Sequence, residues 1–501
     1  MTDLIITKKN EVHVKIKCEK HIAQELSEYF TFFVPGYKFT PTFKSGKWDG
    51  KIRLFNLRTY QIYIGLLPYV EEFCEYNKYT IEYGQDIGVE DEFPLYHAKK
   101  FAESLNVHSD NVKLTVNDHQ LDALKDAMQR RRALLISPTS SGKSLIIYML
   151  FRQLLDYQNL KGIIIVPTTA LVEQLVSDFK DYSSHNGFDV DKHVNKIYGY
   201  VDVVKQTNKP LTISTWQSLY KEDPSYFNQF EYIIGDEAHL FQADSLQKIM
   251  TNCINTKYRI GLTGTLDGTK THQLVLEGVF GAVKKVISTK ELIDHGKVSK
   301  FEIKCIILKH PERIAKYLSD KPYKEEIKYL LSCNTRNRFI RNLAISLEKN
   351  TLILFHEVEN HGEILYNMIK NTEKIGNRNV YYIHGGIDTE DRETIRKILE
   401  KENDAILVAS FGTFSTGSNV KNLHNLILAR PTKSSIRTLQ SIGRTLRNAA
   451  GKEIATLYDI SDDLRYKDNM NTTLKHFVDR VKIYTLEKFP FKTYKIGLKD
   501  E

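Results

Sequence analysis

The chain has 501 residues, of which 41% are hydrophobic, and this is enough for about three domains of roughly 150 residues with sizeable cores. Lys and Arg outnumber Asp and Glu by 71 to 62, so the formal charge of +9 favours a polyanionic partner without identifying one. The first residues, MTDLIITKKNEVHVKIKCEK, lack an apolar core of signal-peptide length, and no run of about 18 apolar residues follows. Secretion and membrane spanning are therefore not expected, and we predict a cytoplasmic protein.

The five cysteines are scattered along the chain, and none forms a C-x-x-C pair or a Cys/His cluster with zinc spacing. We expect reduced thiols and no structural metal. The cysteines are Cys18, Cys74, Cys253, Cys305 and Cys333.

Residues 1–95 are predicted to form a small α+β domain. The stretches VHVKIK, KIRLF and QIYIGLL alternate apolar and polar residues as strands do, and HIAQELSEYF has helical spacing. An acidic segment with Glu82, Asp86 and Glu92 then marks the start of a boundary region.

Within this domain, the stretch KFTPTFKSGKWDGKIRLF (38–55) combines five basic residues and four aromatic residues with a single acidic one. One interpretation is a half-buried hairpin, and we assign Phe39 and Phe55 to the core on this basis. The turn SGKWDG would then carry charge and one ring outward, where they could grip nucleic acid through phosphates and stacking. The residues predicted to do so are Lys44, Lys47, Trp48, Lys51 and Arg53.

Two α/β domains are predicted to follow in tandem, at 96–290 and 291–465. In the first, short apolar runs (RALLIS, GIIIVP, PLTIST, EYIIGDE, YRIGLTG) alternate with helical segments, which indicates a doubly wound parallel sheet. After a polar, helix-prone connection beginning near Lys297, a second series appears: TLILF, NVYYIHG, DAILVAS, NLILA and EIATLYD. Residues 466–501 are expected to form a packing helix and a tail. Its inward positions at helical spacing are Leu474, Phe477, Val478, Val481 and Thr485.

The segment SPTSSGKS (137–144) lies between an apolar strand and a helix, where a phosphate-binding loop is expected. Gly142 would expose backbone N–H groups, Lys143 would contact the β- and γ-phosphates, and the Ser144 hydroxyl would contact Mg²⁺. Ser137 replaces the first glycine of G-x-x-x-x-G-K-[ST], so the strict pattern fails. A Ser/Gly-rich turn that only caps a helix is the structural alternative.

The strand EYIIGDE delivers two carboxylates to the edge of the sheet where ligands bind. Asp236 can hold Mg²⁺ through its water shell, and Glu237 can orient and deprotonate an attacking water. His239 can sense the γ-phosphate. A polar strand end that caps the next helix is the structural alternative.

With Asp236-Glu237-Ala238-His239 in place, the sequence resembles the DEAH-containing branch of the superfamily 2 helicases. The resemblance implies two RecA-like domains that use ATP and Mg²⁺, with the backbone of Ser140, Ser141 and Gly142 around the phosphates. Gln120 would contact the adenine edge, although a polar residue on a helix is an equal alternative. Thr168 and Thr215 would grip a nucleic-acid backbone or cap helices. The family's coupling motif is matched by Thr263, Gly264 and Thr265.

In the second domain, QSIGRTLR (440–447) fits the family pattern Q-x-x-G-R-x-x-R. The resemblance implies that Gln440 contacts the nucleotide and that Arg444 and Arg447 stabilise charge on the γ-phosphate, although an exposed basic helix is the alternative. Gly417 belongs to the preceding motif, SFGTFSTGSN. Asn419 stands where many relatives carry aspartate, which leaves its nucleotide contact open.

The serine-containing loop, the S-T-G-S-N motif and the short N-terminal domain are together similar to the UvsW-type recombination helicases of phages. That resemblance implies a translocase that remodels branched DNA in recombination, repair and replication: reversed forks, Holliday junctions, displacement loops and R-loops. Expected partners are branched or double-stranded DNA, single-stranded DNA and RNA–DNA hybrids, with recombination or single-strand-binding proteins as candidates. The location would be the host cytoplasm.

Three alternatives stay open at this stage. An RNA helicase would share every motor motif. A restriction-type motor subunit would need a nuclease centre, for which Glu326-Ile327-Lys328 supplies an E-x-K triplet on a predicted helix without a matching strand. A nucleotide-gated clamp would bind ATP without hydrolysing it, which the presence of Glu237, Arg444 and Arg447 argues against.

Overall fold

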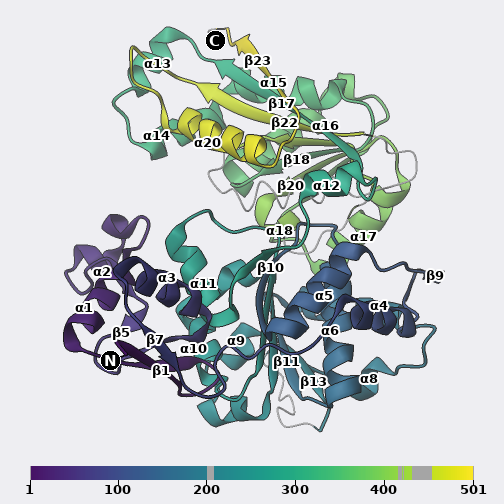
Figure 1. Cartoon of the computed structure of the whole chain (residues 1–501). Helices are drawn as coiled ribbons and strands as arrows, with labels where there is room; N and C mark the ends of the chain where they lie inside the picture. The colour runs from purple at the N-terminus through teal and green to yellow at the C-terminus, as the bar shows by residue number, and fades with distance from the viewer. Residues whose placement is uncertain (1, 200–207, 416–419, 421, 431–453, 500–501) are drawn as a thin grey trace. The chain divides into compact units, whose positions relative to one another are not determined.

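The computed structural model describes residues 2–199, 208–415, 420, 422–430 and 454–499 (Figure 1). The chain divides into two compact units. The first comprises Met1–Ser137 and Gly142–Val286, and the second comprises Pro138–Ser141 and Ile287–Glu501. The N-terminal domain and the first α/β domain therefore belong to one unit.

The N-terminal domain has a five-stranded sheet covered by α1 (Lys20–Tyr29) and α3 (Leu67–Asn77). The strands are antiparallel except for the parallel pair β1–β7. Strand β2 shows why this region folds as a sheet, because Val14 and Ile16 are buried while Lys15 and Lys17 are exposed on the other face. The strand order is β5 (Phe55–Asn56), β6 (Gln61–Tyr63), β2 (His13–Cys18), β1 (Leu4–Lys8) and β7 (Ile81–Tyr83).

A separate hairpin of β3 (Thr31–Phe33) and β4 (Lys51–Arg53) carries the basic and aromatic stretch, and we call it the basic hairpin (residues 31–53). Between its strands lie η1 (Tyr37–Phe39) and α2 (Pro41–Lys44). The Thr40 hydroxyl caps α2. Phe55 is buried as predicted, whereas the assignment of Phe39 to the core is wrong, since its side chain is 81% exposed. The helical turns interrupt the strand alternation on which that assignment depended.

The first α/β domain contains a seven-stranded parallel sheet, and all five predicted strands are present. The two additional strands, β12 and β16, lie at the edges and have short, polar sequences (VNKI and VKK) that the hydrophobic pattern did not reveal. The order is β12 (Val194–Ile197), β13 (Leu211–Thr215), β11 (Gly162–Val166), β14 (Tyr232–Asp236), β15 (Tyr258–Thr263), β10 (Arg132–Ile136) and β16 (Val283–Lys285).

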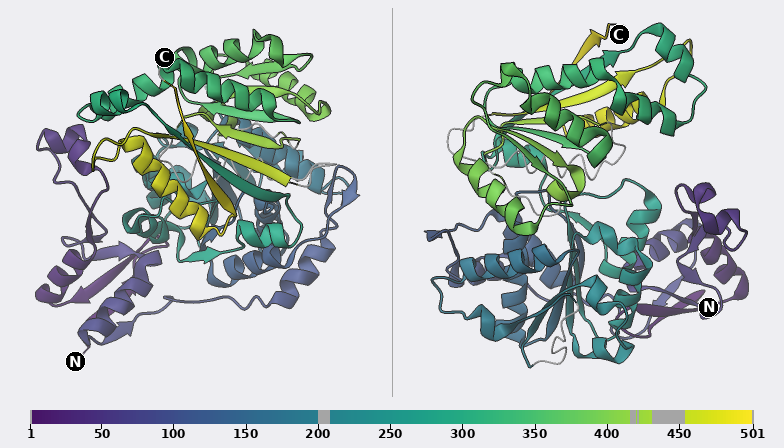
Figure 2. Two further views of the ribbon diagram at one scale, coloured as in Figure 1. Left: turned by 90° about the horizontal axis from the view of Figure 1, so that it is seen from above. Right: turned by 180° about the vertical axis from the view of Figure 1, so that it is seen from behind.

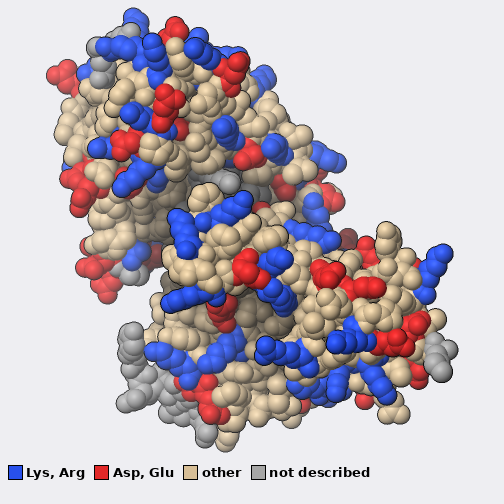
Figure 3. Space-filling view, turned by 90° about the vertical axis from the view of Figure 1, so that its left-hand side faces the viewer, with Lys and Arg blue, Asp and Glu red and all other residues tan. Residues whose placement is uncertain are grey.

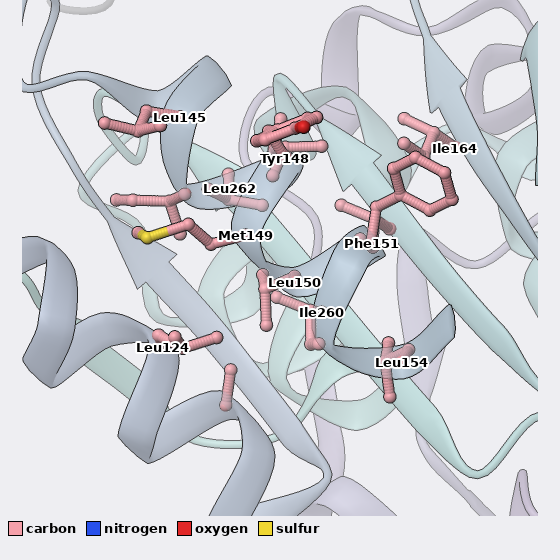
Figure 4. Packing of buried hydrophobic residues seen from close by; sticks show 14 of the residues in the cluster. Leu124, Leu145, Tyr148, Met149, Leu150, Phe151, Leu154, Ile164, Ile260 and Leu262 are labelled. Carbon is pink, nitrogen blue, oxygen red and sulfur yellow. The ribbon is translucent and has the colours of Figure 1, made fainter. Parts of the chain in front are cut away.

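Helices cover both faces of this sheet (Figures 1 and 2). On one face lie α5 (Asp118–Arg130), α6 (Lys143–Gln158) and α7 (Thr169–Tyr182), and on the other lie α10 (Asp244–Asn252) and α11 (Lys270–Phe280). Every residue of α6 from Leu145 to Phe151 is buried, and Figure 4 shows five of them, Leu145, Tyr148, Met149, Leu150 and Phe151, among Leu124, Ile164, Ile260 and Leu262. This packing fixes the first turn of α6, where Lys143 and Ser144 lie.

The second unit is built on another seven-stranded parallel sheet that contains all five strands predicted for it. Two strands were missed: β17, which begins the region expected to be a helix-prone connection, and β23, in the expected C-terminal tail. Helices α13 (Glu312–Leu318), α14 (Tyr323–Ser332) and α15 (Asn334–Ser346) follow β17. The strand order is β19 (Val380–Ile383), β20 (Ile406–Ser410), β18 (Thr351–Phe355), β21 (Asn425–Leu428), β22 (Ile454–Asp463), β17 (Lys300–Lys309) and β23 (Phe491–Gly497).

The C-terminal helix α20 (Thr472–Leu486) packs on this sheet, but its buried face differs from the predicted one. Leu474 and Phe477 are buried as expected, whereas Val478 and Thr485 are exposed. The buried positions instead include Arg480, whose guanidinium bonds both carboxylate oxygens of Asp459, and Tyr484. A hydrophobic pattern could not identify a face whose centre is a buried ion pair.

Glu326 has a structural role that accounts for the E-x-K triplet. Its carboxylate accepts hydrogen bonds from the backbone N–H groups of Thr472 and Thr473 and from the Thr473 hydroxyl, so it caps the N-terminus of α20. Because both carboxylate oxygens are committed to these donors, the nuclease interpretation has no support.

Candidate nucleotide and DNA sites

The predicted phosphate loop follows β10 and ends at the N-terminus of α6. Gly142 is the N-cap of this helix and has φ +83°, a conformation that glycine adopts without strain. The Lys143 ammonium donates to the carbonyl oxygen of Ser137 at 3.2 Å, and the Ser144 hydroxyl lies 2.8 Å from the Tyr182 hydroxyl. Ser140 has φ +70°, and Ser141 donates from its hydroxyl to the carbonyl oxygen of Pro138 at 2.6 Å.

Ser137, which replaces the first glycine of the motif, is fully buried. Its backbone N–H donates to the carbonyl oxygen of Thr263 at 2.8 Å, so the beginning of the loop is tied to the end of the neighbouring strand β15. A serine is therefore accommodated at this position by ordinary backbone pairing.

Gln120 lies against the loop and caps α5. Its Oε1 accepts from the backbone N–H of Asn117 at 2.9 Å, in a reciprocal capping box. A Cβ placed on Gly142 would lie only 2.2 Å from Gln120 Nε2, so the amide group adjoins the phosphate loop. The structural role of Gln120 is thus visible, and its contact with adenine stays a prediction.

Asp236 and Glu237 lie at the carboxyl end of β14, as predicted. The backbone N–H of Glu237 donates to Asp236 Oδ1 at 2.9 Å, and Glu237 has φ +51°, in the left-handed region. Burial raises the pKa of Asp236 to about 6, the Glu237 carboxylate adds to this effect, and the Lys143 ammonium opposes it. A nearby cation would relieve this destabilisation of the charged carboxylate.

His239 connects the carboxylates to the predicted coupling motif. Its Nδ1 lies 2.9 Å from the Thr263 hydroxyl and 3.3 Å from Glu237 Oε2. The Thr263 hydroxyl also donates to the carbonyl oxygen of Thr265 at 3.1 Å, which closes the turn around Gly264. The predicted residues of these two motifs therefore form one hydrogen-bonded cluster.

These residues fit ATP and Mg²⁺. The N-terminus of the long helix α6 offers backbone N–H groups to phosphates, and the lack of a Cβ at Gly142 lets the Gln120 amide lie against the loop. Mg²⁺ usually keeps several waters and takes one or two carboxylates plus phosphate oxygens, which matches Asp236 and the Ser144 hydroxyl. Among the described residues, no group of three or more His, Cys, Asp or Glu that could hold a metal ion was found.

The two threonines predicted to grip a nucleic-acid backbone follow β11 and end β13 at the carboxyl edge of the sheet. The Thr168 hydroxyl caps α7 by accepting from the Leu171 N–H at 3.3 Å. Thr215 is buried, and its hydroxyl lies 3.1 Å from the Ser218 hydroxyl. The capping alternative is thus correct for Thr168, and DNA contact by either residue stays a prediction.

The basic hairpin presents most of its predicted side chains to solvent. Lys44, Lys47 and Arg53 are exposed, and the Lys51 ammonium lies 4.9 Å from the ring centroid of Phe33. Arg53 is paired with Asp49, which reduces its availability to phosphates. Trp48 is half-buried, and its Nε1 donates to the carbonyl oxygen of Lys51 at 2.9 Å.

Figure 3 shows the face of the molecule that carries the N-terminal domain, with Lys and Arg side chains recurring across it between acidic ones. Two exposed lysines on β2, Lys15 and Lys17, were not singled out from the sequence, although the alternation VHVKIK already places them on the outer face of a sheet. His272 was also missed, because no motif signals a buried histidine on a helix.

Five residues of the second domain that the sequence singles out lie outside the described residues: Gly417, Asn419, Gln440, Arg444 and Arg447. Their roles stay predictions. In the described part of the chain, no helix is long and apolar enough to cross a membrane.

Three segments of the chain match known families. Residues 113–268 match the type III restriction enzyme res subunit, residues 335–449 match the helicase conserved C-terminal domain, and residues 3–83 match the N-terminal domain of DNA helicase UvsW. A DNA 3'-5' translocase XPB2 of Sulfurisphaera tokodaii is 25% identical over 153 residues, which are 30% of this chain and 31% of that protein. The DNA-bound restriction-modification enzyme LlaBIII shares the fold, with a TM-score of 0.55 at 15% identity over 77% of this chain and 32% of its own.

One relative matches over almost the whole chain. The ATP-dependent DNA helicase uvsW of Enterobacteria phage T4 is 35% identical over 503 aligned residues, covering 97% of this chain and 98% of that protein. The crystal structure of T4 UvsW matches with a TM-score of 0.53 at 33% identity, over 99% of this chain and all of that one. The chain therefore belongs to the UvsW family of ATP-dependent DNA helicases and is an ATP hydrolase with two tandem RecA-like domains.

Proposed function

We propose that this helicase remodels branched DNA, namely reversed forks, Holliday junctions, displacement loops and R-loops, during recombination, repair and replication. The observation that carries the proposal is the basic hairpin, an exposed group of lysines on a domain that forms one unit with the ATP-binding sheet. A motor that advances along one strand while a second element holds adjacent duplex can move a branch point. Sequence-independent phosphate contacts suit this task, because a branch migrates through any sequence.

In the ATP site, each residue is assigned one task. The backbone around Gly142 and the Lys143 ammonium bind the phosphates, and Glu237 orients the attacking water and accepts its proton. Mg²⁺, when bound with ATP by Asp236 and Ser144, neutralises charge on the phosphates. The contact between His239 and the Thr263 hydroxyl holds the Glu237 segment against the end of β15.

In the DNA site, Lys44, Lys47 and Lys51 are proposed to contact phosphates of the duplex near the branch. Trp48 and the exposed ring of Phe39 offer surfaces for stacking on unpaired bases. Thr168 and Thr215 are proposed to lie along the tracking strand, at the carboxyl edge of the first sheet. Recombination or single-strand-binding proteins are proposed as partners, and the relative from a phage supports action in the host cytoplasm.

The decisive experiment is a panel of ATPase and strand-displacement assays on single-stranded DNA, duplex, fork, four-way junction and RNA–DNA hybrid. We expect the fork and the four-way junction to give the highest kcat and the fastest product formation. Equal activity on linear duplex and on junctions would contradict the branched-DNA proposal while leaving the helicase assignment in place.

A further inference from the structure

His272, in the first turn of α11, ties this helix to the segment that follows Asp236. The side chain is 2% exposed, its Nε2 donates to the backbone carbonyl oxygen of His239 at 2.8 Å, and its Nδ1 lies 3.0 Å from Asp267 Oδ1. Since His239 itself contacts Thr263 and Glu237, the His272 ring braces the backbone that positions these groups.

The N-terminal domain packs against the same helix. Leu274 and Val275 are part of the hydrophobic core of that domain, and Tyr69 donates from its hydroxyl to Glu277 Oε2 at 2.6 Å. The two backbones approach closely at Gly65, where a Cβ would lie 1.9 Å from the carbonyl oxygen of Glu277. The N-terminal domain cannot slide along α11 without opening this core, so a displacement of the helix is passed to the domain.

The N-terminal end of α11 also meets the basic hairpin. The Lys270 ammonium lies 5.9 Å from the ring centroid of Phe32, which belongs to β3 and faces Ile52 of β4 in the hairpin. Lys270 and His272 occupy the same helical turn, so one short segment contacts both the DEAH backbone and the base of the hairpin.

We propose that α11 couples the DEAH segment to the basic hairpin and that His272 is the positioning residue of this coupling. The inference rests on the proposed function, since it takes the hairpin to be a DNA contact. A shift of residues 237–239 on nucleotide turnover would move the first turn of α11 and, through Phe32, the hairpin. By linkage, DNA held by the hairpin favours the arrangement in which Glu237 is correctly placed, so DNA stimulates hydrolysis.

The test compares His272→Leu, which removes the ring donor, with Phe32→Leu, which removes the ring above Lys270 but keeps an apolar side chain. For each variant, ATPase kcat and KM are measured with and without fork DNA, and fork affinity is measured by fluorescence anisotropy. We expect the ratio of stimulated to unstimulated kcat to fall at least about fivefold in both, with fork affinity and the KM for ATP within about twofold of wild type.

The double variant separates coupling from two unrelated defects. If both residues act through α11, the double variant is no more impaired than the worse single variant, whereas multiplicative losses would overturn the inference. His272→Gln, whose amide can still donate to His239, should retain most of the stimulation. It takes the place of His272→Leu in the test if that variant fails to fold. His295→Leu, at an exposed histidine, is the matched control.

The two proposals fail in different ways. A wild-type enzyme whose ATPase does not respond to any DNA would remove the proposed function. A wild-type enzyme that responds to fork DNA, together with variants that respond equally well, would remove only the coupling through α11.

Discussion

Gly142 and Gln120 are in such close contact that a Cβ on the glycine would lie 2.2 Å from the Nε2 of the glutamine. Gly142 also has φ +83°, so Gly142→Ala adds both strain and a clash at the phosphate loop. We expect this substitution to lower kcat for ATP hydrolysis by about 100-fold or more, because a small misplacement of catalytic groups is costly. Steady-state ATPase assays will measure it.

A matched control exists for this change. Gly187 has φ +74° with no atom within 4 Å of a built Cβ, so Gly187→Ala imposes the same backbone strain without a clash. It should cost about 1 kcal/mol of stability and leave ATPase activity intact. Equal ATPase rates in both alanine variants would show that the contact with Gln120 is unimportant.

The assignments of Lys143 and Glu237 are tested by Lys143→Ala and Glu237→Gln. Both variants should lose DNA-stimulated ATPase activity, because one removes the charge that binds the phosphates and the other removes the base. Fork binding should stay largely unchanged, since the basic hairpin is untouched. Normal ATP turnover by either variant, measured beside the wild type, would refute the assigned role of that residue.

The basic hairpin is tested by replacing Lys44, Lys47 and Lys51 with Glu together. Each lost phosphate contact should weaken fork binding and reduce the slope of log affinity against log salt by about 0.9. Titrations at several salt concentrations give both quantities, and unstimulated ATPase should be spared. The same charge change at three exposed lysines of the first α/β domain, Lys99, Lys100 and Lys113, is the control. Unchanged fork affinity in the hairpin variant would show that the basic hairpin has a purely structural role.

The sequence predicted ten of the fourteen strands of the two α/β domains because buried parallel strands are continuous apolar runs. It also predicted that the phosphate loop and the DEAH carboxylates follow strands, which is enough to bring them to one sheet edge. The missed strands β12 and β16 are short and polar, and β23 is largely exposed, so none of them has a hydrophobic signature.

Contacts between side chains that lie far apart in the sequence could not be predicted from it. Phe39 was assigned to the core from local alternation, but two helical turns remove it from any strand. Glu326 and Thr473 are far apart in sequence, and so are Tyr69 and Glu277, and no periodic pattern encodes such contacts. The coupling of His272 to His239 became visible only when the two segments were placed side by side.

The capping role of Glu326 predicts a loss of stability on substitution. Glu326→Ala removes the buried carboxylate that accepts from the N–H groups at the N-terminus of α20. Because these groups would then lack an acceptor, we expect the free energy of unfolding to fall by about 2 to 4 kcal/mol. Chemical denaturation will measure the change. Lys328→Ala, which lies on α14 together with Glu326, should be nearly neutral. A stable Glu326→Ala protein would contradict the capping role.

Stability should also depend on pH through His13, which stacks on Tyr63 with ring centroids 4.8 Å apart. Burial lowers the pKa of His13 from its ordinary value of 6.5 to about 4, and the positive charges of Lys9 and Arg259 contribute. Because the unfolded chain takes up a proton at higher pH than the folded protein, the stabilisation is complete above pH 6.5 and is lost as the pH falls toward 4. The loss should be at most about 3 kcal/mol, reduced by solvent screening.

His13→Gln removes this titration, so the variant should lose less stability than the wild type between pH 6.5 and pH 4. The remaining dependence in this range includes His361, where burial lowers the pKa to about 3. His21→Gln, at a side chain that is 60% exposed, is the control and should follow the wild-type curve. Unfolding curves at intervals of pH give the comparison, and identical pH dependence in the wild type and His13→Gln would show that His13 is not the titrating group.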